Sequence, residues 1–116
     1  MRDRVEVLMP LPDGRFLVER LADPRWPANV GKLRCPGGKI EAGETAVAAA
    51  VRELLEEYSL DLIATGLTLH SVTPGPRGQI TRLMYAYVSQ DWIGRLMEEG
   101  GGEMLVAVNH VPALWL

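Results

Sequence analysis

The amino-acid sequence predicts a mixed α/β fold, because strand-like runs lie on both sides of one long helical run. Residues 45–58 contain no Gly or Pro and are rich in alanine, which favours a helix. Runs of branched and aromatic residues precede and follow this helix, and a second, shorter helical run comes later. Strands on both sides of a long helix are typical of a mixed α/β domain.

The first third of the chain predicts a strand pair followed by a loop. Residues 4–9 (RVEVLM) form a strand-like run with imperfect alternation. Pro12-Asp13-Gly14 is a turn signal, so residues 15–21 (RFLVERL) are expected to return as the second strand of a hairpin. Residues 22–31 contain two prolines and are predicted to form a loop.

The central segment predicts a short strand, a glycine turn and the long helix. Residues 32–35 are expected to form the strand, which enters a tight turn at Pro36-Gly37-Gly38. Two glycines allow the backbone there to approach a ligand closely. The helix then presents one apolar face at helical spacing. We expect this face to consist of Val47, Val51, Leu54, Leu55 and Tyr58.

The last third predicts more strands, one short helix and an acidic loop. Residues 67–72 and 80–88 are strand-like and are separated by a loop at 73–79 that holds two prolines and two glycines. Ser89-Gln90-Asp91 can cap a helix that runs to residue 97. A loop at 98–102 (EEGGG), a strand at 105–108 and a short segment at 111–116 complete the chain.

Composition narrows the functional classes. A chain of 116 residues suffices for one core, so we expect a single domain over residues 1–116. The net charge of −3 offers no general basic surface for a nucleic acid polymer. The one cysteine, Cys35, permits no intramolecular disulfide. The start MRDRVEV lacks the apolar core of a signal peptide, and no apolar run is long enough to span a membrane, so we expect a cytoplasmic protein.

Three carboxylates lie on one side of the predicted helix. Glu53, Glu56 and Glu57 follow i, i+3, i+4 spacing, where like charges repel by a few tenths of a kcal/mol per pair. They also lie near the helix C-terminus, where the helix dipole disfavours negative charge. A cluster of three oxygen anions suits a hard divalent cation, Mg²⁺ or Mn²⁺. A solvated acidic face is the alternative, because that is what charge runs usually form.

The glycine turn and the acidic helix together match a known signature. Gly38, five residues, Glu44, seven residues, and then Arg52-Glu53-Leu54-x-Glu56-Glu57-x-x-Leu60 resembles the signature of the Nudix hydrolases. One position departs, since Ser59 stands where the family usually has Gly. Helices often end on a left-handed residue, and we expect serine there to cost about 1 kcal/mol.

The resemblance implies an α/β/α sandwich with a mixed β-sheet between helices. It also implies a metal-dependent pyrophosphohydrolase that cleaves a nucleoside diphosphate linked to another group. The first candidate is hydrolysis of a (deoxy)nucleoside triphosphate to the monophosphate and pyrophosphate, with Mg²⁺ or Mn²⁺ as cofactor. An ADP-ribose or nucleotide-sugar pyrophosphatase is the alternative, and a non-catalytic nucleotide-binding regulatory module is a third. Its partner would be a small nucleotide, and the protein a monomer or homodimer.

The same resemblance assigns roles around the metal. Glu53, Glu56 and Glu57 are the expected metal ligands, completed by Gly37 and Glu98. Glu44 and Arg52 would arrange these carboxylates, and in the sequence alone Arg52 is equally a surface residue. Catalytic roles are expected for Glu53, Glu56, Arg52 and Glu98. The general base is left open among Glu53, Glu56, Glu98 and Glu99, of which Glu98 is preferred as a loop acid.

Substrate contacts are expected mainly from basic residues near the glycine turn. A guanidinium matches the geometry of a phosphate. The alternative for each arginine is that it is a solvated surface charge with no contact to the substrate. Trp26 would stack on a base or pack on the core. The predicted substrate-binding residues are Gly38, Lys39, Arg20, Arg25, Trp26 and Arg34.

Overall fold

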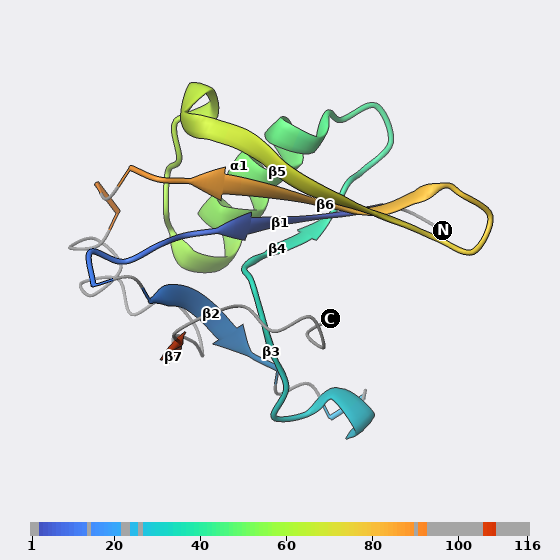
Figure 1. Cartoon of the computed structure of the whole chain (residues 1–116), viewed down its shortest axis with the longest axis horizontal. Helices are drawn as coiled ribbons and strands as arrows, with labels where there is room; N and C mark the ends of the chain where they lie inside the picture. Colours follow the sequence, from blue (N-terminus) through green and yellow to red (C-terminus); the bar gives the residue numbers. More distant parts are fainter. Residues whose placement is uncertain are drawn as a thin grey trace.

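The computed structural model describes residues 3–13, 15–21, 24–25, 27–89, 91–92 and 106–108, the last three by their backbone alone (Figure 1). One α-helix and short 3-10 turns connect the strands of this part of the chain. In chain order the elements are β1 (Arg4–Leu8), β2 (Phe16–Arg20), η1 (Pro27–Asn29), β3 (Leu33–Arg34), β4 (Gly37–Lys39), α1 (Ala46–Tyr58), η2 (Ala64–Gly66), β5 (Leu67–Pro74), β6 (Ile80–Tyr87) and β7 (Val106–Val108). The helix described here is not long and apolar enough to cross a membrane.

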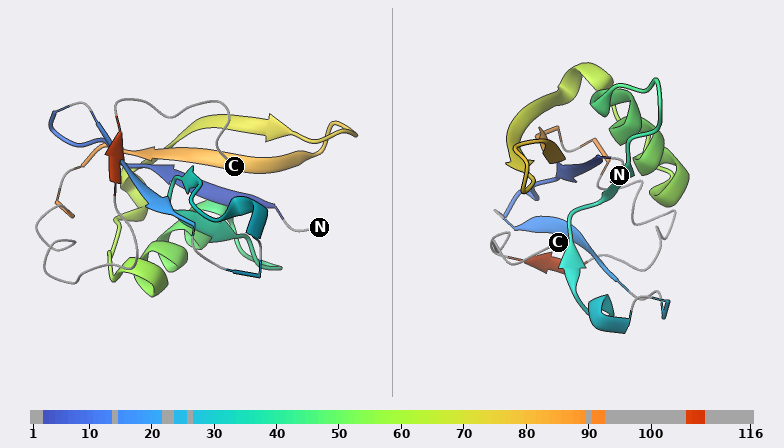
Figure 2. Two further views of the ribbon diagram at one scale, coloured as in Figure 1. Left: turned by 90° about the horizontal axis from the view of Figure 1, so that it is seen from below. Right: turned by 90° about the vertical axis from the view of Figure 1, so that its right-hand side faces the viewer.

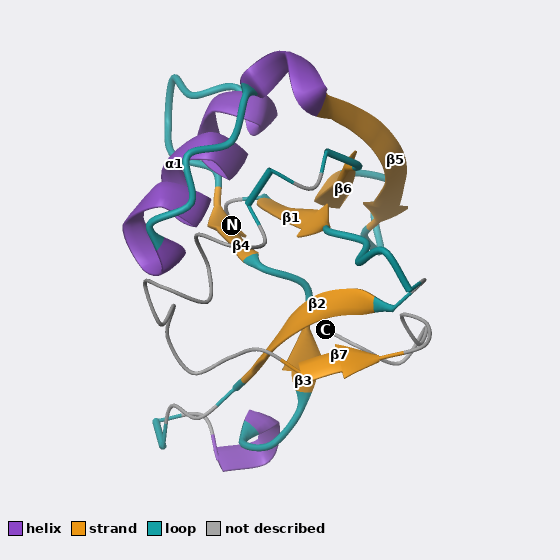
Figure 3. Cartoon of the chain, turned by 90° about the vertical axis from the view of Figure 1, so that its left-hand side faces the viewer, coloured by secondary structure: helices purple, strands orange, loops and turns teal. Residues whose placement is uncertain are grey.

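Within the described ranges, the strands form two sheets. A four-stranded sheet has the order β4-β1-β6-β5, and a three-stranded sheet has the order β3-β2-β7. The first sheet is mixed, because β1 pairs antiparallel with β4 and parallel with β6. The α1 helix lies on one side of this sheet and the three-stranded sheet on the other (Figures 2 and 3). The predicted α/β class with a mixed sheet is therefore confirmed, while the second helix predicted up to residue 97 lies outside the described residues.

Strand β1 separates an apolar layer from a polar one. Side chains alternate across a strand, so Val5 and Val7 share one face while Arg4 and Glu6 share the other. Val5 and Val7 are fully buried in the main core, which also contains Leu54 of α1. The face of β1 that carries Glu6 therefore points away from the helix, towards the three-stranded sheet.

The predicted hairpin of the first two strands is wrong beyond its turn. Backbone bonds join Leu17 to Met9 and Leu11 to Arg15, and Pro10 forms an isolated bridge with Phe16. Strands β1 and β2 then diverge into different sheets. The reason is burial, since β1 is covered on both faces and takes a central position between β4 and β6.

The predicted glycine turn is also wrong, because Gly37 and Gly38 lie in strand β4. Neither has a positive φ; among the described glycines, only Gly31, Gly43 and Gly78 do. Close packing explains the glycine at Gly37, where an added Cβ would overlap the carbonyl oxygen of Val5 in β1. The backbones of β4 and β1 therefore leave no room for a side chain at this position.

The helix forms where it was predicted, but it buries a different stripe. Thr45 caps its N-terminus by accepting a hydrogen bond from the Ala48 N–H at 3.1 Å. Its buried residues are Ala49, Ala50, Leu54 and Tyr58. Leu55, predicted on the apolar face, is 50% exposed. Leu55 follows Leu54 by about 100° around the helix, so it lies outside the buried stripe that Leu54 belongs to.

The helix ends on a strained residue. Ser59 has φ 57° and ψ 28°, in the left-handed region, and it is the only described non-glycine residue with a positive φ. Its N–H donates to the Leu55 carbonyl at 3.1 Å, and the Leu60 N–H donates to the Leu54 carbonyl at 3.2 Å. These bonds cap the last turn, so serine occupies a position that glycine adopts without strain.

We therefore expect Ser59→Gly to stabilise the fold. The substitution removes the Cβ that makes the left-handed conformation costly, and should raise the free energy of unfolding by about 1 kcal/mol. Urea denaturation followed by circular dichroism measures the change. Ser59→Ala is the control, because it keeps the Cβ and should bring no gain. A Ser59→Gly protein no more stable than wild type would contradict the strain.

Candidate active site

Arg52 joins three segments of the chain. Its Nε and Nη2 donate to the two carboxylate oxygens of Glu44 at 2.7 and 2.9 Å, a bidentate pair. Its Nη2 also donates to the Lys39 carbonyl of β4 at 3.0 Å. Its Nη1 donates to Glu53 Oε1 at 2.8 Å and to Glu56 Oε2 at 3.3 Å. One guanidinium thus fixes the loop before the helix, strand β4 and two helix carboxylates.

The pair between Arg52 and Glu44 is electrostatically strong. Hydrogen bonds from Arg52, with a further bond from the Glu41 N–H at 3.0 Å, hold the pKa of Glu44 at about 2. The same pairing raises the pKa of Arg52 above its ordinary value. Glu44 and Arg52 are therefore both ionised across the physiological range, and their geometry does not change with pH there.

Gly38 makes room for Glu53. A Cβ added at Gly38 would overlap the carboxyl group of Glu53. The Glu53 side chain is only 13% exposed, although helix periodicity placed it on an exposed acidic face. A side chain at residue 38 would thus displace a carboxylate from the position that Arg52 holds.

Glu57 lies in a crowded acidic environment. Desolvation is the largest cause that raises its pKa, to about 7, although its side chain keeps solvent access. Repulsion from Glu19 of β2 and a hydrogen bond with Glu53 act in the same direction. Two of the three predicted helix carboxylates, Glu53 and Glu57, are therefore neighbours, whereas the Glu56 side chain is 58% exposed.

These carboxylates fit a divalent cation by their chemistry. In the described part of the chain, no three acidic, His or Cys side chains converge into a ready metal cage. The donors present are nevertheless all carboxylate oxygens, which Mg²⁺ and Mn²⁺ prefer. Arg52 uses one oxygen each of Glu53 and Glu56. The repulsion that raises the pKa of Glu57 is the kind that a bound cation relieves.

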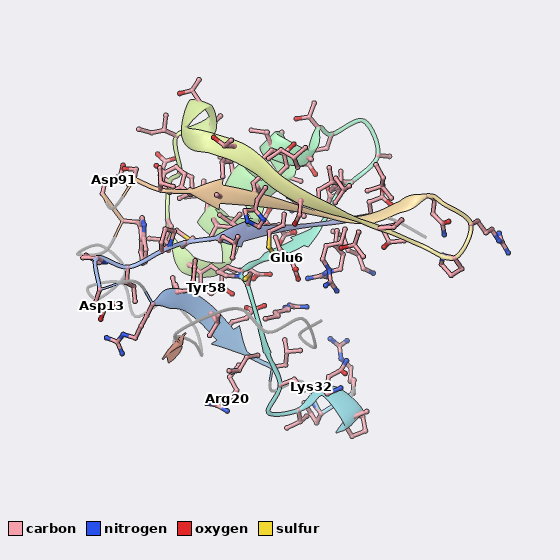
Figure 4. The ribbon with its side chains drawn as sticks, viewed as in Figure 1. Glu6, Asp13, Arg20, Lys32, Tyr58 and Asp91 are labelled. Carbon is pink, nitrogen blue, oxygen red and sulfur yellow. The ribbon has the colours of Figure 1, made fainter. Side chains whose placement is uncertain are left out.

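A second network, missed by the sequence analysis, supports the inner side of the helix. The Tyr58 O–H donates to Glu19 Oε2, and Arg34 Nε donates to Glu19 Oε1. Tyr58 was predicted only as an apolar face residue; Figure 4 labels it beside β2. These partners are far apart in the sequence. The available signal was a charge at Glu19 within the strand-like run FLVER.

The remaining predicted substrate residues are less closely grouped. Arg34 is bound to Glu19. Lys39 is exposed at the end of β4. Arg20 donates to the Gly31 carbonyl at 3.4 Å and lies at the far end of β2, away from Tyr58 (Figure 4). Arg25 is exposed in the segment that leads to η1.

Three predicted site residues cannot be placed in this network. Trp26, Glu98 and Glu99 lie outside the described residues, so their expected roles stay predictions.

Comparisons with known proteins identify a matching family and fold. A family model described as NUDIX domain matches residues 2–115. A search of curated proteins finds no match. The solved structures that match this chain include a MutT NUDIX hydrolase from Burkholderia pseudomallei, with 25% identity, a TM-score of 0.59, and coverage of 76% of this chain and 67% of that one.

Two further structures show the same fold. The E. coli ORF135 protein has 22% identity and a TM-score of 0.57, with 97% of this chain and 70% of that chain covered. MutT of Aliivibrio salmonicida or Vibrio cholerae has 20% identity and a TM-score of 0.57, with 76% and 63% covered. This chain therefore spans about two-thirds of the length of these proteins.

Because Glu44 pairs with Arg52, we expect the stability of the folded protein to depend on pH. The pKa of Glu44 is about 2 in the folded state, below its ordinary 4.5. Its stabilising effect is therefore complete above about pH 4.5 and is lost as the pH falls towards 2. We expect Glu44→Gln to lower the free energy of unfolding at pH 7, and the difference from wild type to shrink below pH 4.5. Urea denaturation at several pH values measures it.

The matched control is Glu41→Gln. Glu41 is 65% exposed and its carboxylate lies 4.0 Å from Arg52, so its replacement should change stability little at any pH. A Glu44→Gln deficit that is the same at pH 7 and pH 3 would show that the ion pair is not its cause.

Proposed function

The chain belongs to the NUDIX domain family and is a Nudix hydrolase, and we propose that it cleaves a nucleoside diphosphate linked to another group, with a divalent cation. One observation carries this proposal. Arg52 holds Glu53 in the space that Gly38 leaves open, with Glu57 beside it. A helix built only for stability would place cations, not this acidic group, near its C-terminus.

We propose that the substrate is a (deoxy)nucleoside triphosphate, hydrolysed to the monophosphate and pyrophosphate. The matched structures include one described as a MutT NUDIX hydrolase, at 25% identity, and the family model matches residues 2–115. We further propose that the chain acts as one domain, in the cytoplasm, on a small nucleotide. The net charge of −3 does not favour a nucleic acid polymer.

The proposed roles of the site residues follow from their contacts. Glu53, Glu56 and Glu57 would hold Mg²⁺ or Mn²⁺, which when bound supplies charge neutralisation and an activated water. Arg52 orients Glu53 and Glu56 through one oxygen each. Lys39, exposed next to Gly38, is available to a phosphate oxygen. A carboxylate would accept the proton of the attacking water, with Glu53, Glu56, Glu98 and Glu99 as the candidates.

Loss of one proposed ligand should abolish most turnover. We expect Glu57→Gln to lower kcat for nucleoside triphosphate hydrolysis with Mg²⁺ by about 100-fold or more, because the amide carries no negative charge for the cation. Chromatography of the products from a panel of nucleotide derivatives measures both the rate and the bond that is cleaved. Full activity of both Glu57→Gln and Glu56→Gln would rule out the helix carboxylates as the metal site.

Asp61→Asn is the control for this experiment, since Asp61 is an exposed acid just beyond the helix. It should hydrolyse at the wild-type rate. If the wild-type protein binds nucleotides but hydrolyses none of them, the chain is instead a binding module.

Gly38 should matter through Glu53. We expect Gly38→Ala to lower kcat at least about tenfold, because the new Cβ displaces the Glu53 carboxyl group. A double-mutant cycle with Glu53→Gln measures the coupling. Gly38→Ala should cost much less in the Glu53→Gln background than in the wild type. Independent, additive losses would show that Gly38 acts by another route.

A further inference from the structure

Glu19 of β2 is a largely buried carboxylate beside the acidic helix. Its side chain is only 13% exposed. Its Oε1 accepts a hydrogen bond from Arg34 Nε of β3, and its Oε2 accepts one from the Tyr58 O–H at the end of α1. Both oxygens of this acid therefore have partners, and the network joins the three-stranded sheet to the last turn of the helix (Figure 4).

Tyr58 contributes a hydrogen bond to this network and no charge. Burial is the largest cause that raises the pKa of its hydroxyl above its ordinary value, and the charge and hydrogen bond of Glu19 act in the same direction. The hydroxyl therefore stays protonated across the physiological range and donates to Glu19. The negative charge that balances Arg34 within this network is thus that of Glu19.

Arg34 lies within electrostatic reach of more than one acid. Desolvation and acidic neighbours raise the pKa of Glu57, and the positive charge of Arg34 acts against them. The Arg34 side chain is 23% exposed, so its charge is poorly hydrated and requires an acidic partner. Glu6 also acts on Arg34, but that carboxylate already lies beside Arg82. Glu57 is therefore the alternative partner for Arg34 if Glu19 does not hold it.

Building on the proposed function, we propose that Glu19 is a positioning residue that holds Arg34 away from Glu57 and so keeps this carboxylate free for the cation. A guanidinium and a divalent cation compete for the same carboxylate oxygens, since each supplies positive charge to them. Arg52 already binds one oxygen of Glu53. A second guanidinium on Glu57 would leave the cation with fewer oxygens still.

Titration with Mn²⁺, followed by the electron paramagnetic resonance signal of the free ion, tests this without nucleotide or turnover. We expect Glu19→Gln to weaken Mn²⁺ binding at least about threefold, because glutamine keeps the shape of the side chain and loses the charge that holds Arg34. The double variant Glu19→Gln/Arg34→Gln should return the affinity to within about twofold of wild type, because the competing guanidinium is then gone.

This double variant separates positioning from simple anchoring of the helix. If Glu19 only tied α1 to the sheet, removal of both partners would weaken Mn²⁺ binding at least as much as Glu19→Gln alone. Tyr58→Phe is the matched control, because it removes the other hydrogen bond of Glu19 without a change of charge. It should lower the free energy of unfolding in urea and leave the Mn²⁺ affinity unchanged.

A shorter acid provides the same test if Glu19→Gln does not fold. Glu19→Asp keeps the charge but reaches less far towards Arg34, so it should also weaken Mn²⁺ binding. Glu19→Asp/Arg34→Gln should restore the binding. Loss of affinity in both of these variants would assign Glu19 a structural role and overturn the inference.

Glu57→Gln, titrated alongside, separates failure of this inference from failure of the proposed cation site. If Glu57→Gln binds Mn²⁺ more weakly than wild type and Glu19→Gln does not, the site stands and the inference is overturned. A double variant that binds no better than Glu19→Gln also overturns it. If Glu57→Gln binds Mn²⁺ as tightly as wild type, Glu57 is not a ligand, and the inference is rejected together with that assignment.

Discussion

The arrangement of the candidate site depends on one guanidinium. Arg52 pairs with both oxygens of Glu44 and reaches Glu53, Glu56 and the Lys39 carbonyl. Without it, several partly buried carboxylates would repel one another with no positive charge between them. A lysine could not replace it, because a point charge cannot make a bidentate pair and two further contacts in fixed directions. The helix can therefore carry its acidic group only because this arginine is part of it.

Strand β4 imposes the second constraint, because it lies in close contact with both β1 and α1. Gly37 lies against the Val5 carbonyl of β1, and Gly38 lies against the carboxyl group of Glu53 in α1. A side chain at Gly37 would overlap the backbone of β1, and one at Gly38 would displace the Glu53 carboxyl group. Gly37 thus allows β4 to pair closely with β1, and Gly38 leaves room for the Glu53 carboxyl group. Their role is close packing in an extended strand, not the left-handed backbone of a turn.

Local sequence patterns predicted the long helix. They did not predict features that depend on contacts between residues far apart in the sequence. The helix was expected at 45–58 and is found from Ala46 to Tyr58. It could be predicted because alanine-rich sequence and the Thr45 cap favour a helix through contacts within a single turn. The family resemblance implied that Glu44 and Arg52 arrange the helix carboxylates, and Arg52 does contact Glu44 and Glu53. The exposure of Leu55 depends instead on which side of the helix packs against the rest of the fold. The bond from Tyr58 to Glu19 joins residues 39 positions apart, a separation at which no periodicity gives information.

The side chains of β1 alternate between its two faces, and this alternation connects the constraints above. Its Val5 and Val7 side chains hold the helix against the sheet, while the intervening Glu6 faces the other sheet beside Arg82. The pKa values of the acidic residues in the candidate site differ because their surroundings differ. Arg52 holds the pKa of Glu44 at about 2, whereas desolvation and acidic neighbours raise the pKa of Glu57 to about 7. One face of β1 thus packs against the helix, and the other carries a buried carboxylate beside an arginine.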